Sequence, residues 1–277
     1  MAYQNFKPTI WAAGIETELE RVAIYALDCN RNYEGDVKQM GDTVRILGVG
    51  KPTVTTTTNK AISLSAAETV EDTSVVMAIN HVSYFNFKVD DIDKHEASGD
   101  IMEALRSEAS EALAHEADQL IADLAKDAQF ATVYSSVTKI EKANILSSIS
   151  TGIAKLWKNN VSPNTEIVVT LSPSAAELFF QAYTALDTNN SEYLKNGYLG
   201  KYMGATIKMS STVATDSSGY EYMLIRTKRA IAYAQPLTHV EAYRPESGFA
   251  DALKGFILYE AKIVRPKEAV VLNAKYS

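Results

Sequence analysis

The chain has 277 residues, 46% of them apolar and 22% charged, so it can bury the core of one large domain or of two intermeshed domains. Its net charge of −7 argues against a duplex-binding module, because such modules need a basic face for phosphate contacts. The sequence has no run of about 18 apolar residues and no basic-then-apolar N-terminus, so we predict neither a membrane span nor a secretory signal.

Motifs for catalysis or metal binding are missing or incomplete. With one cysteine, Cys29, and four scattered histidines, the chain has neither a disulfide framework nor a zinc constellation. His95 and His115 each precede a glutamate, but no second histidine follows at the spacing of a zinc protease. The acids of Asp90–Asp93 lack the rest of a calcium loop, and the glycines between residues 197 and 204 lack the partners of a phosphate loop. We therefore predict no catalytic, cofactor-binding or metal-binding residue, and a protein that is not an enzyme.

The N-terminal part combines a helix with two strands. Apolar residues recur at helical spacing from Thr9 to Asp28, with Trp11 near the start, and predict an amphipathic helix. A strand is predicted to begin at Gly41, and a second strand is predicted over Val75–Val89. The packed end of that second strand is expected at its aromatic and branched residues: Tyr84, Phe85, Phe87 and Val89.

The segment between these strands cannot bury much surface by itself. From Thr53 to Asp72 it consists largely of Thr, Ser, Ala and Glu. Two strands around a polar span predict a long hairpin, whose strand edges remain unpaired in an isolated subunit. We expect Val54, Ile62 and Leu64 to contact a neighbouring copy of the chain.

Two further helices are predicted in the middle of the chain. The longer runs from Ile101 to Asp127 and would be roughly 40 Å long, with a capping-box-like start at Asp100 and Glu103. Between Asp90 and Ala128 there are twelve Asp and Glu against three Lys and Arg, so negative charge is concentrated on this element. The second helix is predicted over residues 137–158. The apolar side of the longer helix is expected to comprise Leu105, Ala109, Leu113, Leu120, Ile121 and Leu124.

The C-terminal half is mainly strands. A buried strand over Glu166–Leu171 leads through Ser172 and Pro173 into a helix over Ala175–Tyr183. Tyr193 and Tyr198 lie near predicted turns, where either internal packing or contact between subunits explains them. The whole pattern predicts an α+β fold. The remaining predicted strands are Thr206–Met209, Met223–Arg226, Val240–Tyr243 and Phe256–Val264, followed by a tail punctuated by Pro266.

A colinear series of segments resembles the major capsid proteins of tailed bacteriophages. The most telling block is NYEGDVKQMGDTVRI, and FNFKVDDID follows it before the acidic helix. LSPSAAELF, LKNGYLGKYMGATIKMSSTV and AYRPESGFADALKGFILYEAKIVRP then occur in the order of the middle and end of that family. The resemblance covers nearly the whole chain and lies in the order of these segments, because no single motif is as specific as a metal signature.

The resemblance implies the Hong Kong 97-type capsid fold and a division of the chain. By this mapping, residues 1–40 form an N-terminal arm and residues 41–82 an extended β-hairpin, the E-loop. Residues 83–160 form the P-domain with a spine helix over 101–127. Residues 161–234 form the A-domain, and residues 235–277 return to the P-domain.

The same resemblance implies a structural role in a virion. The chain would assemble with itself into hexamers and pentamers of an icosahedral or prolate shell, in the host cytoplasm, around a double-stranded DNA genome bound without sequence specificity. Portal and scaffolding proteins would be partners, and no membrane would be involved. Residues expected at contacts between subunits are Trp11, Val54, Ile62, Leu64, Tyr193 and Tyr198.

The acidic charge suggests a role for the long helix, and two alternatives to a phage capsid protein stay open. An acid-rich helix facing the genome would repel DNA and let it slide instead of sticking. An encapsulin-like compartment would share the fold but enclose protein cargo. An enzyme or small-ligand binder with an unrecognised site is the alternative from another class.

Overall fold

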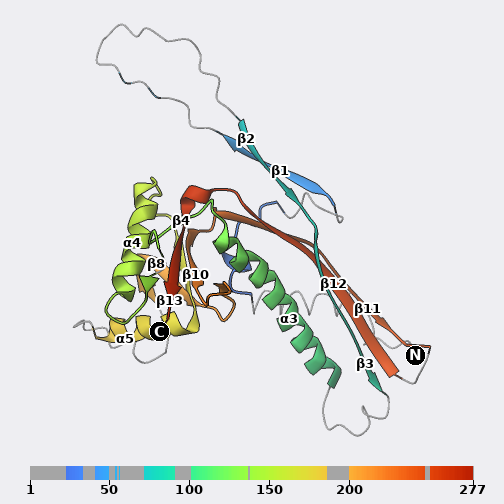
Figure 1. Ribbon diagram of the computed structural model, residues 1–277. Helices are drawn as coiled ribbons and strands as arrows, with labels where there is room; N and C mark the ends of the chain where they lie inside the picture. Colours follow the sequence, from blue (N-terminus) through green and yellow to red (C-terminus); the bar gives the residue numbers. More distant parts are fainter. Residues whose placement is uncertain are drawn as a thin grey trace.

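The computed structural model describes residues 23–33, 41–49, 54, 56, 72–90, 101–136, 138–185, 200–246 and 250–276. Figure 1 shows a body built on two β-sheets and three α-helices, and a two-stranded ribbon that projects from the body. None of the helices in these residues is long and apolar enough to cross a membrane.

An eight-stranded mixed sheet forms one part of the body. Its main path runs β4-β13-β10-β6-β8-β7, with β5 on β13 and β9 on β10. Helices α4 (Ile145–Lys158) and α5 (Pro173–Thr184) share a core with the sheet, and every side chain of β6 is buried. The strands are β4 (Ala131–Thr132), β5 (Thr138–Lys139), β6 (Ile167–Leu171), β7 (Lys201–Tyr202), β8 (Ala205–Met209), β9 (Ala214–Thr215), β10 (Glu221–Thr227) and β13 (Ala269–Lys275).

Helix α5 begins where the sequence predicted a helix start. Ser172 is its N-cap, and the Ser172 hydroxyl accepts a hydrogen bond from the Ala175 N–H at 3.2 Å. Pro173 occupies the first helical position, where a missing N–H costs no hydrogen bond. The predicted strand before it and the predicted helix are both confirmed.

Two predictions for this sheet are wrong. The helix predicted over residues 137–158 begins only at Ile145, because Thr138 and Lys139 pair with β13 and Asn144 is the N-cap. The tail after Pro266 contains a strand, β13, which pairs with β10 over six residues and is almost entirely buried. The sheet thus contains strands that precede residues 161–234, strands within them and one strand that follows them in the sequence.

A long three-stranded sheet forms the other part of the body, in the order β11-β12-β3. Its antiparallel strands are β11 (Ile231–Tyr243), β12 (Ala250–Ile263) and β3 (His81–Asp90). Helix α3 (Ile101–Asp123) packs along β12 and β3 and continues into a 3₁₀ turn, η3 (Leu124–Lys126), so the long predicted helix is confirmed. Buried side chains of α3 that form the core with this sheet are Leu113, Ala114, Ala117, Ile121 and Ala122.

The ribbon consists of β1 (Thr43–Val49) and β2 (Asp72–Ala78), paired antiparallel from Thr43 opposite Ala78 to Val49 opposite Asp72. The predicted hairpin strands therefore exist, but the single strand predicted over Val75–Val89 is wrong. That stretch is two strands, because the chain leaves the ribbon at Ile79 and Asn80 and joins the body sheet as β3.

The N-terminal described segment is short. The structure describes only the last residues of the helix predicted over Thr9–Asp28, and these form a 3₁₀ turn, η1 (Ala26–Asp28). A second 3₁₀ turn, η4 (Pro266–Glu268), precedes β13.

Candidate functional site

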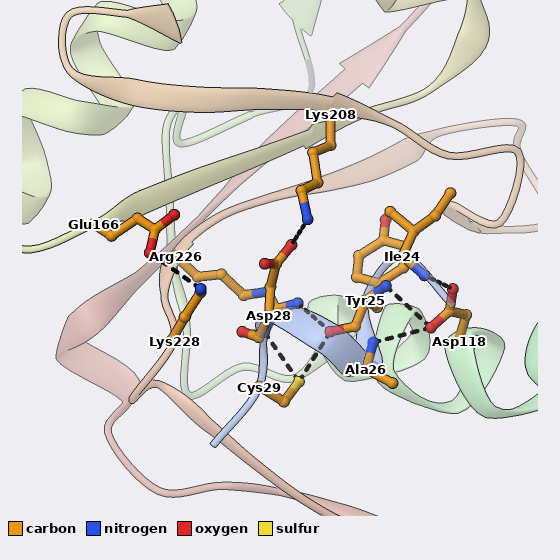
Figure 2. A network of polar contacts seen from close by, with 10 residues as sticks. All are labelled: Ile24, Tyr25, Ala26, Asp28, Cys29, Asp118, Glu166, Lys208, Arg226 and Lys228. Atoms are coloured by element: carbon orange, nitrogen blue, oxygen red, sulfur yellow. Dashed lines mark hydrogen bonds and ion pairs between the residues drawn. The ribbon is translucent and has the colours of Figure 1, made fainter. Parts of the chain in front are cut away.

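A buried polar network holds the N-terminal segment against the body (Figure 2). We call it the clasp and define it by six residues from η1, α3, β8 and β10 and their flanks: Tyr25, Asp28, Cys29, Asp118, Lys208 and Arg226. None of them was predicted as a site residue, and the three from the body, Asp118, Lys208 and Arg226, lie more than 80 residues along the chain from the three of the N-terminal segment. The clasp matters because it fixes residues 24–29 against the body.

Asp118 of α3 binds three consecutive backbone N–H groups of this segment. Its carboxylate accepts hydrogen bonds from the N–H groups of Ile24 at 2.7 Å, Tyr25 at 3.0 Å and Ala26 at 3.0 Å. These are donors at the start of η1 that have no partner inside so short a helix. Burial raises the pKa of the Asp118 carboxyl, while the three N–H donors and the nearby Arg226 charge oppose that rise.

Arg226 of β10 binds the other side of the same segment. Its guanidinium is fully buried and donates to the carbonyl oxygens of Asp28 at 2.7 Å and Tyr25 at 2.9 Å. It also donates to the Cys29 sulfur at 3.1 Å and lies 5.7 Å from the centre of the Tyr25 ring. A buried cation surrounded by carbonyl oxygens is stabilised there, so the network orders the segment around it.

Two further contacts complete the attachment. Lys208 of β8 forms an ion pair with the buried Asp28 carboxylate at 2.6 Å. The backbone of Asn30 pairs with β11, since Asn30 N–H donates to Ile231 and Tyr233 N–H donates to the Asn30 carbonyl. The segment is thus attached to both sheets and to α3.

The clasp does not have the features of a catalytic centre. Burial raises the pKa of the Cys29 thiol, which keeps it in the unreactive protonated form, and burial likewise raises the pKa of Tyr25. Within the described residues, no group of three His, Cys, Asp or Glu side chains could hold a metal ion. The polar groups of the clasp bind the protein's own backbone, which indicates a structural role.

The base of the ribbon packs on the body through a small apolar cluster. One face of β1 and β2 contributes Val44, Ile46 and Met77, and Ile79 follows β2; all four are buried. They contact Ala232, Ala234 and Leu258 of β11 and β12. Beyond this base Figure 1 shows β1 and β2 directed away from both sheets, so the ribbon's edges find no strand partner within the described chain.

Of the six residues expected at subunit contacts, the structure describes one. Val54 is 85% exposed. Trp11, Ile62, Leu64, Tyr193 and Tyr198 lie outside the described residues.

Several other large apolar side chains are exposed, and the sequence did not predict their exposure. Tyr84 was predicted at a packed strand end, but that is wrong, because it is 79% exposed on the face of β3 directed away from α3. Its neighbours Phe85 and Phe87 pack on the core with stacked rings. The remaining large apolar side chains with substantial exposure are Leu27, Val76, Val82, Phe180, Met203 and Met209.

The acidic helix α3 has two kinds of carboxylate. Glu108, Glu111, Glu116 and Asp123 are exposed, whereas Asp118 is buried in the clasp. Among the carboxylates of α3 whose side chains the structure describes, the first group therefore forms the acidic surface.

The chain matches no protein-family model and no curated protein. Its fold, however, is similar to those of solved viral structures. A chain from Mycobacterium phage Che8 is 29% identical, with a TM-score of 0.75 and 90% of each chain covered. The capsid of the cyanophage P-SCSP1u is 15% identical, with a TM-score of 0.70, covering 92% of this chain and 89% of that chain. A virus-like particle from Pyrococcus furiosus is 12% identical, with a TM-score of 0.61, covering 97% and 99%.

Proposed function

Because this chain has the fold of a phage major capsid protein over about nine-tenths of its length, we propose that it is the subunit of an icosahedral or prolate phage shell. In that role it forms hexamers and pentamers with copies of itself. The role is structural rather than catalytic. The virion capsid is its location, reached by assembly in the bacterial host cytoplasm.

The projecting ribbon is the observation that carries this proposal. Its base is anchored in an apolar cluster, but its strands leave the body and present unpaired edges. Unpaired edges and exposed apolar residues such as Val54 and Val76 are stabilised when a neighbouring copy covers them. Repeating such a contact around closed symmetric rings turns modest contacts into a stable shell.

The domain division follows the same proposal. Residues 1–40 serve as the arm, 41–82 as the E-loop, 83–160 and 235–277 as the P-domain, and 161–234 as the A-domain. The clasp supports the arm assignment, since it attaches residues 24–30, the C-terminal side of the proposed arm, to the body. Trp11, Val54, Ile62, Leu64, Tyr193 and Tyr198 are the proposed contact residues between subunits.

The proposed partners are those that a packaged genome requires. The exposed carboxylates of α3 support a DNA-facing wall to which DNA does not adhere, so double-stranded DNA is held without sequence-specific contacts. Portal and scaffolding proteins complete the assembly.

A cellular compartment that encloses protein cargo is the second candidate. The observation in its favour is the nearly complete overlap with the virus-like particle from Pyrococcus furiosus. Nucleic acid inside purified particles supports the phage shell, and co-purified protein cargo without nucleic acid supports the compartment.

A ribbon deletion tests the shell function. Because Val49 and Asp72 are the last paired residues of β1 and β2, residues 50–71 can be replaced by Asn-Gly, a sequence that closes a two-residue hairpin. We expect the expressed full chain to form uniform hollow particles in negative-stain micrographs. The shortened chain should remain folded by circular dichroism but form no closed shell. Normal shells from the shortened chain would contradict the proposal.

A further inference from the structure

The joint between the ribbon and the body contains a polar contact that the apolar packing does not explain. The chain passes from β2 to β3 through Ile79 and Asn80 (Figure 1). Here β12 continues past the residue opposite His81, where β3 begins, and the ribbon base packs on Leu258 of β12 and on Ala232 and Ala234 of β11. The joint is therefore where the direction of the ribbon is decided.

Glu260 of β12 binds the chain at this joint. Its Oε2 accepts from the backbone N–H of Asn80 at 3.3 Å and lies 3.0 Å from Nδ1 of His81. Its other oxygen accepts from the Ala261 N–H at 3.3 Å. The Glu260 side chain is 12% exposed, and that of His81 is 49% exposed. One carboxylate thus binds the backbone of the connecting residues and the first side chain of β3.

The apolar contacts and the hydrogen bonds at the joint differ in how strongly they depend on orientation. Apolar contacts between Met77 or Ile79 and the body depend on the area buried and tolerate small rotations. Hydrogen bonds to a carboxylate weaken steeply when their geometry is lost. The hydrogen bonds between Ile79 and residues 41 and 42 tie the two ribbon strands together, but they do not reach the body sheet. Glu260 is the polar side chain of the body for which the structure shows a bond to the connecting residues.

From this geometry we infer that Glu260, with His81, is a positioning latch that sets the angle of the ribbon relative to the body. The inference rests on the proposed shell function for its biological meaning, because the ribbon angle then decides how a subunit reaches its neighbour. Glu260 and His81 then control the geometry of assembly without taking part in the contact between subunits.

A distance measurement on the dispersed subunit tests the latch. Spin labels at Ser74→Cys and Glu111→Cys report the ribbon's position relative to α3, since both sites are exposed and the native Cys29 is buried. We expect one narrow distance distribution for the parent and a broad one for Glu260→Ala. The matched control is Glu241→Ala, which removes a carboxylate paired with Lys254 at 3.0 Å on the same sheet, away from the joint. It should keep the parent distribution.

Hydrogen exchange gives a second readout that a merely stabilising residue would not change. In Glu260→Ala the Asn80 amide should exchange about tenfold faster, while the Ile79 amide, bonded to Asp42, keeps its rate. If Glu260→Ala fails to fold, His81→Leu serves instead, because it changes an exposed side chain and leaves Glu260 in place. It should broaden the distances to a smaller extent.

The outcomes separate the latch from the shell function. If Glu260→Ala shows broad distances and forms shells of mixed diameter, both the latch and the shell function are supported. If Glu260→Ala shows broad distances but the parent chain forms no shell, only the latch is supported. Unchanged distances and unchanged Asn80 exchange in Glu260→Ala, or unchanged distances in His81→Leu if that variant is used, would overturn the latch whether or not shells form.

Discussion

Removal of the Asp118 carboxylate should detach the N-terminal segment from the body and destabilise the subunit. Asp118→Ala leaves the N–H groups of Ile24, Tyr25 and Ala26 without their acceptor in a buried setting. A hydrogen bond to a charged group contributes about 1.5–3 kcal/mol, and a buried donor left without its acceptor costs about 1–3 kcal/mol. These contributions overlap across the three N–H groups, so we expect a loss of about 3–5 kcal/mol for Asp118→Ala.

Asp118→Asn distinguishes the lost charge from the lost acceptor. The amide oxygen can still accept from Tyr25 and Ala26, but the amide nitrogen faces the Ile24 N–H, so we expect a loss of about 2 kcal/mol. Asp123→Asn is the matched control, because Asp123 lies on the same helix in an exposed pair with Lys126 and should change stability by about 0.5 kcal/mol or less.

The assay combines denaturant unfolding of dispersed subunits with hydrogen exchange. Exchange of the amides of residues 24–26 should accelerate in both Asp118 variants and not in Asp123→Asn. If Asp118→Ala unfolds within about 0.5 kcal/mol of the parent and these amides stay protected, the reasoning that the carboxylate holds the segment is refuted.

Two further predictions concern carboxylates elsewhere in the body. Burial opposes ionisation of Glu268, but hydrogen bonds from Thr227 at 2.6 Å and Arg265 at 3.0 Å, with Arg229 nearby, hold its pKa below the ordinary value of 4.5. The contribution of ionised Glu268 to stability is therefore complete above pH 4.5 and is lost as the pH falls through the lowered pKa. Glu268→Gln should thus make the free energy of unfolding depend less on pH in the acid range. An unchanged dependence on pH would contradict this. Reversal of Glu108, Glu111 and Glu116 to Lys should make particles retain host nucleic acid or slow packaging, measured by the absorbance ratio of purified particles, whereas Glu177→Lys on α5 should not. Unchanged nucleic-acid content in the triple variant would argue against the DNA-facing wall.

Elements with a strong local signal could be predicted from the sequence. The run Ile167–Leu171 is apolar except for Thr170 and lies buried in the middle of a sheet, and Ser172 with Pro173 marks the start of α5. The periodic apolar residues of α3 likewise predicted a long helix and its inner face. In these segments local preference and tertiary packing favour the same structure.

Other features depend on contacts between distant segments, which no local pattern contains. The polar pair Asn80 and His81 is the one local mark of the break in the run from Val75 to Val89, and it does not show that the strand partner changes from β1 to β12. The strand β13 was missed because it follows the proline-containing turn η4, and its pairing with β10 spans about 50 residues of sequence. Long-range pairing therefore decides these boundaries.

The clasp could not be predicted for the same reason. Asp118 lies in a helix rich in carboxylates, where an exposed position is the ordinary interpretation, and its partners lie more than 90 residues away. Arg226 follows the apolar residues Met223–Ile225 in β10, and its burial is explained by the carbonyl oxygens of residues 25 and 28 and by the Cys29 sulfur. A charged residue directly after an apolar run in a strand is the signal that could have indicated a buried partner.

The central claim is that copies of this chain provide the burial that its ribbon lacks within the subunit. A cryo-electron microscopy reconstruction of particles assembled from the expressed full chain tests it most directly. We predict a closed shell in which each ribbon lies across the body of an adjacent subunit. A uniform monomer, or particles in which the ribbon folds back on its own body, would contradict the claim.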